Sequence, residues 1–215
     1  MGAVTTGLDN RPLLIATTNP GKTAEIQHIL RDLPITLLTL ADLPAMPEPE
    51  EHGRTFAENA QIKAIAYASA FSLPTVADDS GLVIDALGGR PGVLSARYPG
   101  STYAEKFANL YRELAPYPRP WTARFECALG FVDPGWSLEH TRYSCEAPIH
   151  GEIATGPKGT FGFGYDPIFL YLPYGRTLGE VTGDEKLAVA HRGKAFRMFR
   201  DWLLRETTPS GSPAY

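Results

Sequence analysis

The stretch that most constrains this chain is an apolar run that meets two adjacent carboxylates. The largely apolar residues 73–77 lead into Asp78 and Asp79, a serine and a glycine follow, and apolar residues resume at Leu82. Because Asp and Gly are depleted inside strands, we expect the strand to end where the acids begin. Successive side chains of an extended chain point to opposite faces, so the two carboxylates should diverge and only one should aim into a given cleft. By itself the stretch favours a solvated turn, with a functional site at a strand end as the alternative.

Composition sets the class of protein. The chain has 215 residues, 43% hydrophobic and 20% charged, which is typical of a globular protein with one large domain or two closely joined lobes. A net charge of −4 gives no general attraction to nucleic acid or to an anionic membrane, although a local basic site remains possible. Cys127 and Cys145 have no metal-ligand spacing, and we expect reduced thiols. Without an apolar run of membrane-spanning length or a secretory signal pattern, we predict a cytoplasmic location.

A segment near the N-terminus combines strand, turn and helix signals. Residues 13–16 are an apolar run typical of a buried strand, and residues 23–33 repeat apolar positions at helical spacing. The turn between them consists of Thr17, Thr18, Asn19, Pro20, Gly21 and Lys22. Free N–H groups and the helix dipole would face an anion there, which predicts a phosphate site. An ordinary strand–turn–helix unit with an exposed lysine fits equally well, and the P-loop motif fails because its first glycine would fall at Ala16.

An acidic, proline-rich loop follows. Residues 34–51 contain four prolines and end in Glu48, Glu50 and Glu51. We expect a solvated loop, with a short strand at residues 35–40.

The next segment carries a helix start signal. Thr55 and Glu58 have the spacing of a capping box, which opens an alanine-rich helix to about residue 70. This gives Glu58 a structural role. Asn59 and Lys63 are four residues apart and share a helical face, and a lysine in such a place is more often a surface residue.

The remaining pattern predicts further strands and helices. We expect a strand at 82–87, a turn at 88–92 and a helix at 103–114. A half-buried strand at 124–132 should form a hairpin with a strand through about residue 146, and residues 190–194 should enter a last helix. Residues 1–11 and 206–215 are expected to be a flexible lead-in and a disordered tail, which leaves residues 12–205 as a single domain.

Two later segments have the composition of a ligand site. In residues 159–167 glycines alternate with aromatic residues, which allows a planar ligand to approach the backbone and stack, but a packed glycine-rich loop has the same composition. His191 and Arg192 open the last helix, where cations are disfavoured by the dipole. This conflict indicates an anionic or acceptor-rich ligand.

Six motifs in order carry a resemblance to a known family. They are Thr17-Thr18-Asn19-Pro20-Gly21-Lys22, Thr55-Phe56-Ala57-Glu58-Asn59-Ala60 with Lys63, Ala77-Asp78-Asp79-Ser80-Gly81-Leu82, Pro91-Gly92-Val93 with Ser95-Ala96-Arg97-Tyr98, Phe161-Gly162-Phe163-Gly164-Tyr165-Asp166-Pro167, and His191-Arg192-Gly193. Together, over about residues 13–204, they resemble the Ham1-like family of inosine/xanthosine triphosphate pyrophosphatases. The resemblance implies an elongated mixed α/β fold with two lobes around a cleft, and usually a homodimer. It also implies Mg²⁺-dependent hydrolysis of ITP, dITP and XTP to the monophosphate and pyrophosphate.

The resemblance also assigns roles to residues. Asp79 is similar to the family's proton acceptor and Mg²⁺ ligand, and Glu51 to its second metal carboxylate. The residues that the resemblance places on the substrate are Thr17, Thr18, Asn19, Pro20, Gly21, Lys22, Lys63, Ser80, Phe163, Gly164, Tyr165, Asp166, Lys186, His191 and Arg192. Two positions depart from the family pattern, because Ala190 stands where we expect Ser or Thr, and Leu94 where we expect an aromatic residue.

Two competing functions have less support. A catalytically silent nucleotide-binding module on the same scaffold does not require the intact acids Glu51 and Asp79. A pyrophosphatase of the related Maf-like type, acting on modified pyrimidines, is not supported by the pair of His191 and Arg192.

Overall fold

The computed structural model describes Leu8 and residues 11–206. Most of the expected lead-in (1–11) and tail (206–215) lies outside these described residues. Within the lead-in, Leu8 is fully buried in the main hydrophobic core. No helix in this part of the chain is long and apolar enough to cross a membrane.

Seven strands of the described chain form one sheet, in the order β2-β1-β3-β4-β5-β6-β7. The strands are β1 (Leu13–Ile15), β2 (Leu37–Thr39), β3 (Thr75–Ile84), β4 (Thr122–Val132), β5 (Tyr143–Ile153), β6 (Phe169–Tyr171) and β7 (Arg176–Thr177). The helices are α1 (Pro20–Leu30), α2 (Phe56–Phe71), α3 (Tyr103–Leu114), α4 (Gly183–Val189) and α5 (His191–Arg205). Strand β1 is parallel to both β2 and β3, and the other pairs are antiparallel. The predicted mixed α/β fold with flanking helices is confirmed.

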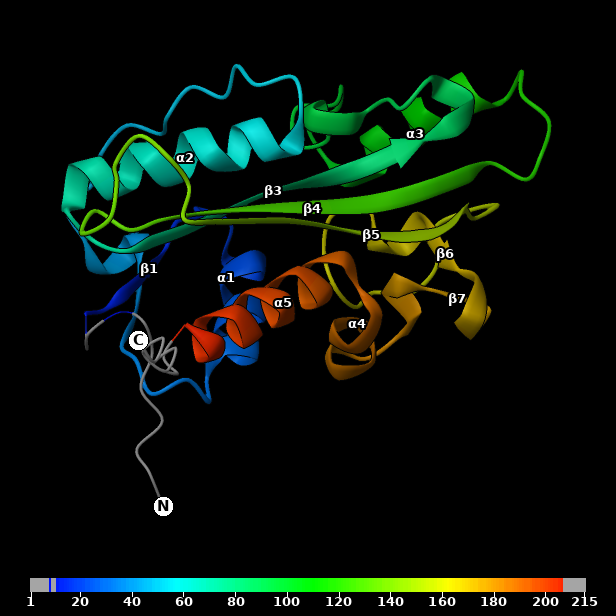
Figure 1. Cartoon of the computed structure of the whole chain (residues 1–215). Coiled ribbons are helices and arrows are strands. Elements are labelled where there is room, and N and C mark those ends of the chain that lie inside the picture. Colours follow the sequence, from blue (N-terminus) through cyan, green and yellow to red (C-terminus); the bar gives the residue numbers. More distant parts are fainter. Residues whose placement is uncertain (1–7, 9–10, 207–215) are drawn as a thin grey trace, which may run out of the picture.

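The long strands β3, β4 and β5 give the molecule its elongated shape (Figure 1). Helix α2 lies on one face of this sheet, and α1 and α5 lie on the other (Figure 1). The second strand of the predicted hairpin continues beyond residue 146, because β5 pairs with β4 as far as Glu152. One of the two large core clusters lies between the sheet and helices α1 and α5, and includes Phe131, Phe196 and Phe199.

Strand β4 is more buried than its sequence predicts. The predicted inward side chains are indeed buried, namely Phe125, Cys127, Leu129 and Phe131. The description as half-buried is wrong for the second half of the strand, where Ala128 and Gly130 on the opposite face are buried as well. Helix α2 covers them so closely that a Cβ atom on Gly130 would lie 3.0 Å from the Ala60 carbonyl oxygen. Ala128 and Gly130, whose positions alternate with the inward-facing ones, therefore form the surface on which helix α2 packs.

Strand β3 does not end at the acidic pair. It runs without interruption through both carboxylates, and Asp78 and Asp79 pair with Leu129 and Ala128 of β4. The prediction of a strand end was wrong because the ladder to β4 supports residues of low strand propensity. On its other side β3 pairs with β1 only up to Val76 and forms an isolated bridge from Val83 to Pro91, so no strand covers the edge of β3 between these points.

Candidate active site

A cavity of about 480 Å³ lies beside this free edge of β3. Its wall contains every residue to which the resemblance gave a role except Pro20 and Gly21. Across this cavity, residues from the β1–α1–α2 end of the molecule face Val93, residues 95–97, Tyr103 and residues 163–166 from the other end. The arrangement agrees with two lobes around a central cleft.

The turn before α1 is fixed by its own cap. The Asn19 side-chain oxygen accepts hydrogen bonds from the N–H groups of Gly21 at 2.9 Å and Lys22 at 3.2 Å. Pro20 at the first helical position has no N–H group. The expectation of free N–H groups facing an anion is therefore wrong for these residues. The cation that this turn directs into the cleft is the Lys22 ammonium.

Gly21 connects this turn to the aromatic loop. Its φ is not positive, so the backbone conformation does not demand a glycine. A Cβ atom at this position would instead lie 2.8 Å from a ring carbon of Phe163. The glycine therefore permits close contact between the turn and the aromatic ring.

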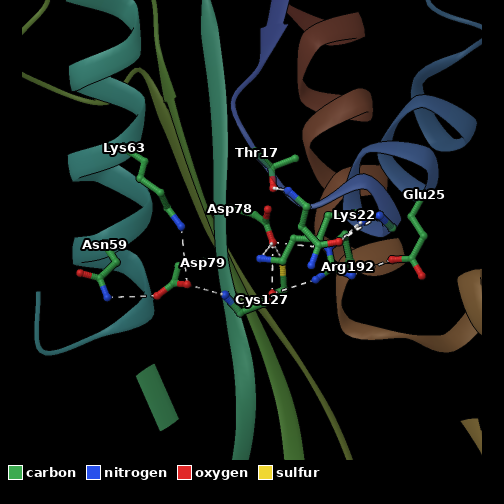
Figure 2. A network of polar contacts seen from close by, with 12 residues as sticks. Thr17, Lys22, Glu25, Asn59, Lys63, Asp78, Asp79, Cys127 and Arg192 are labelled. Atoms are coloured by element: carbon green, nitrogen blue, oxygen red, sulfur yellow. Dashed lines mark hydrogen bonds and ion pairs between the residues drawn. The ribbon is translucent and has the colours of Figure 1, made fainter. Parts of the chain in front are cut away.

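The two carboxylates of β3 diverge as predicted (Figure 2). Asp79 lies on the α2 side, where the Asn59 amide donates a hydrogen bond to it at 3.1 Å and the Lys63 ammonium lies 3.6 Å away. Asp78 lies on the side of α1 and α5, close to Lys22 and Arg192 (Figure 2). The alternation of side chains along a strand thus sends neighbouring acids to different partners.

Asp79 has the environment of a proton acceptor. Burial raises its pKa above the ordinary value, against the lowering effect of the Lys63 and Lys22 charges, and Glu51 adds to the rise. Its Oδ1 atom also accepts a hydrogen bond from the Ser80 N–H at 3.0 Å, which fixes the carboxylate beside the cavity. A carboxylate whose charged form is destabilised takes up a proton more readily than an exposed one.

Asp78 is a buried ionic centre. Its side chain is fully buried, and its Oδ2 atom accepts hydrogen bonds from the Lys22 ammonium at 2.9 Å, the Ser80 hydroxyl at 3.2 Å and Nε of Arg192 at 3.4 Å. Although burial acts to raise its pKa, the charges of Lys22, Arg192 and Lys63 hold that pKa far below the usual range. Asp78 therefore stays charged and anchors cations that line the cavity.

Glu51 and Asp79 share one ammonium group. Lys63 Nζ lies 2.7 Å from Glu51 Oε1 and 3.6 Å from Asp79 Oδ1, so a cation already stands between the two carboxylates. Burial acts to raise the pKa of Glu51, but the hydrogen bond and charge of Lys63 give a net lowering. The side chain of Lys63 is 15% exposed and that of Lys22 is 16% exposed, so neither is an ordinary surface lysine.

This donor set fits a hard divalent cation. Mg²⁺ typically uses one or two carboxylates and completes its shell with water and substrate phosphates. In residues 11–206 and Leu8, no three Asp, Glu, His or Cys side chains are grouped to hold a metal by themselves. A cation at Glu51 and Asp79 would thus complete its coordination with water and, when substrate is bound, with oxygen atoms of the phosphate chain.

The aromatic loop faces a second set of cations. The Lys186 ammonium lies 4.3 Å from the centroid of the Phe163 ring, and the Arg192 guanidinium 5.5 Å from it. Lys186 is held by Asp166 at 2.6 Å and by Glu25 at 2.8 Å. Glu25 also binds Arg192 at 2.6 Å. The sequence reasoning missed Glu25, although its position one helical turn after Lys22 could have signalled it.

The start of α5 corrects one expectation. His191 is buried and its ring stacks on Phe125, with centroids 4.8 Å apart. Burial, together with the charges of Arg192 and Lys186, lowers its pKa well below the ordinary value, so the imidazole is neutral at neutral pH. The carboxylates of Glu25 and Asp78 form ion pairs with Arg192 and neutralise its charge. The conflict with the helix dipole is therefore resolved without a ligand.

The two departures from the family pattern have simple structural settings. Ala190 is the N-cap of α5, and that cap has no side-chain hydrogen bond. Leu94 is 56% exposed and lies in the turn that precedes Arg97.

Comparison with known proteins agrees with this geometry. Residues 13–202 match the Ham1 family. The chain belongs to the Ham1 family. A dITP/XTP pyrophosphatase of Geobacter sulfurreducens is 46% identical over 194 residues, which cover 89% of this chain and 96% of that protein. The dITP/XTP pyrophosphatase of Bacillus subtilis is 44% identical, over 86% of this chain and 92% of its own length. The structure of a HAM1 protein from Coxiella burnetii superposes with a TM-score of 0.83 at 38% identity, over 91% of this chain and 99% of that one.

Proposed function

We propose that this Ham1-family protein hydrolyses the non-standard purine nucleoside triphosphates ITP, dITP and XTP to the monophosphate and pyrophosphate. The observation that carries the proposal is that Asp79, Glu51, Lys22 and Lys63 line the same cavity as the aromatic ring of Phe163. One cavity thus offers carboxylates, cations and a stacking surface. The names of the relatives supply the substrate class.

The proposed reaction needs no nucleophilic side chain. A water oxygen attacks the α-phosphorus, the bond from that phosphorus to the bridging oxygen breaks, and pyrophosphate leaves. Asp79 takes the proton of the attacking water, a role that its raised pKa suits. Lys22 and Lys63 stand in the cavity wall where they can neutralise charge that develops on the phosphate oxygens.

We infer that Glu51 and Asp79 hold the divalent cation, and that this cation is Mg²⁺. When bound, such a cation neutralises phosphate charge and orients the attacking water. Lys63, which now stands between the two carboxylates, would then contribute its charge to the phosphate chain instead.

Recognition of the base follows from the donors near Phe163. Lys186 and Arg192 can only donate hydrogen bonds, which suits the 6-oxo group of hypoxanthine or xanthine and opposes the 6-amino group of adenine. The neutral His191 can also accept, and its Nδ1 atom is buried with no hydrogen-bond partner among the described residues. A buried polar mismatch of this kind discriminates by roughly 10⁴-fold. Rejection of guanine would come from close packing around residues 163–165.

Release of pyrophosphate from ITP, XTP, dUTP, ATP and GTP tests the function. We expect rapid release from ITP and XTP, little from the other three, and loss of activity in Asp79→Asn with binding retained. Arg192→Ala should lower kcat/KM for ITP much more than for ATP and leave discrimination against GTP less affected. Binding without release in the wild type would favour the silent module, and a preference for dUTP would favour a pyrimidine-directed enzyme.

The proposal includes a homodimer, which the resemblance implies, and a cytoplasmic location, which rests on the sequence patterns described above. Light scattering after size-exclusion chromatography measures the oligomeric state, and a monomer at micromolar concentration would contradict this part.

A further inference from the structure

Arg97 reaches the same cavity from residues 92–97, a segment to which the resemblance gives no role. It follows the short 3₁₀ helix Gly92–Leu94, and its side chain lines the cavity. The backbone beneath it is firmly held, because the Ser95 hydroxyl accepts a hydrogen bond from the Leu82 N–H at 2.9 Å and the Tyr165 hydroxyl donates one to the Ser95 carbonyl at 2.8 Å. The Arg97 side chain itself is 54% exposed. The charged group of Arg97 is thus exposed to solvent, while hydrogen bonds hold the backbone that carries it.

Arg97 and Lys63 together occupy both oxygen atoms of Glu51. Lys63 Nζ lies 2.7 Å from Oε1, and the Arg97 guanidinium donates to Oε2. Each oxygen keeps a second lone pair, but a divalent cation that binds Glu51 is repelled by the two positive charges already in contact with this carboxylate, so its binding favours the departure of one of them. Lys63 is 15% exposed and is shared with Asp79, whereas the pair with Arg97 is exposed and contributes little to stability. Arg97 is the partner that exchanges more easily.

A guanidinium released from Glu51 would stand at a cavity wall that already carries Lys22 and Lys63. Its planar fork can donate two parallel hydrogen bonds to phosphate oxygens, which an ammonium group cannot do. We propose that Arg97 is a further polyphosphate-binding residue, held by Glu51 until a divalent cation takes that carboxylate. This inference rests on the proposed function for the nature of the ligand.

Arg90 provides a matched control from the same segment. Its side chain is 59% exposed and pairs with Glu113 at 2.8 Å, but it does not line the cavity. Arg90→Ala therefore removes an exposed, paired arginine without touching the cleft. Arg97→Lys keeps the charge of Arg97 and removes the fork.

The test measures two ligands that bind without turnover. Binding of Mn²⁺ alone to the free protein is followed by electron paramagnetic resonance, and binding of inorganic pyrophosphate by calorimetry with and without Mn²⁺. Arg97→Ala should bind Mn²⁺ about threefold or more tightly, because Glu51 has lost a competing cation. With Mn²⁺ present it should bind pyrophosphate roughly tenfold to a hundredfold more weakly, since charge-assisted hydrogen bonds are lost. The affinities of Arg97→Lys for both ligands should fall between those of the wild type and Arg97→Ala, and Arg90→Ala should have the wild-type affinities.

Shifts of opposite sign for the two ligands support the proposal. Unchanged pyrophosphate binding would overturn it, as would weaker binding of both ligands, which indicates that Arg97 only supports the loop of Glu51. If Arg97→Ala weakens pyrophosphate binding equally with and without Mn²⁺, the proposed transfer of Arg97 from Glu51 to phosphate on metal binding is wrong. The titrations use no nucleotide, so a protein that fails to hydrolyse ITP but shows the opposite shifts refutes the proposed function and leaves the role of Arg97 standing.

Discussion

Replacing Asp78 by asparagine removes one buried negative charge and keeps the size of the side chain. The wild-type carboxylate is fully buried and binds the Lys22 ammonium at 2.9 Å and Arg192 Nε at 3.4 Å. Asp79→Asn makes the same chemical change at the next residue, where the carboxylate meets Asn59 and the more distant Lys63. We expect the first change to act mainly on stability and the second mainly on catalysis.

The magnitude follows from the partners left behind. Removing one member of a buried ion pair costs about 3–5 kcal/mol in the free energy of unfolding. Lys22 is 16% exposed and can be hydrated, and Arg192 keeps Glu25 at 2.6 Å, so we place Asp78→Asn at the lower end. A loss of about 3 kcal/mol lowers Tm by roughly 6–12 °C in a protein of this size.

The signs of the pKa shifts set the pH dependence. The pKa of Asp78 is lowered, so its contribution to stability is present above the ordinary value of 3.8 and is lost as pH falls through the lower folded value. The pKa of Asp79 is raised, so its contribution to stability is present below the ordinary value of 3.8 and is lost as pH rises through the higher folded value. At pH 7 this contribution is already lost, and we expect Asp79→Asn to change the free energy of unfolding by less than about 1 kcal/mol, which shifts Tm by at most about 4 °C in a protein of this size.

Urea unfolding at pH 7 measures these differences, and Asp133→Asn is the matched control. The Asp133 side chain is 2% exposed and pairs with Arg11 and Arg142, yet it does not line the cavity. Asp133→Asn should lower the free energy of unfolding by about as much as Asp78→Asn does, and it should keep the wild-type kcat. If Asp78→Asn and Asp79→Asn unfold at the same urea concentration, the assignment of different roles to the two carboxylates is wrong.

Three further predictions concern catalysis. Asp79→Asn should lower kcat for ITP by at least about a hundredfold. Because the pKa of Asp79 is raised, kcat/KM of the wild type should fall with decreasing pH through a pKa above 3.8, and the same fall in the variant would contradict the role of Asp79 as base. Gly21→Ala places a Cβ atom 2.8 Å from the Phe163 ring and should raise KM for ITP about tenfold, by the loss of roughly 1.4 kcal/mol of binding, with an unchanged KM as the contrary result. Lys22→Ala and Lys63→Ala should each weaken inhibition by pyrophosphate about tenfold or more, and normal inhibition in both would remove the lysines from the phosphate site.

Local features of this protein were determined by its sequence. The Thr55 hydroxyl accepts from the Glu58 N–H at 3.1 Å, as the capping-box spacing predicts, and α2 begins at the next residue. Asp78 and Asp79 diverge because side chains alternate along any extended chain. These features depend on residues a few positions apart, whose interactions are set before distant segments meet.

The tertiary structure decided which distant residues share their charges. Strand β3 passes through the acidic pair because β4 supplies its ladder along the whole strand. Arg192 is neutralised by Glu25, 167 positions away, and His191 is neutral because α5 buries it against Phe125. Burial and ion pairing depend on which surfaces pack together, and that is settled only when α1, β3 and α5 come into contact.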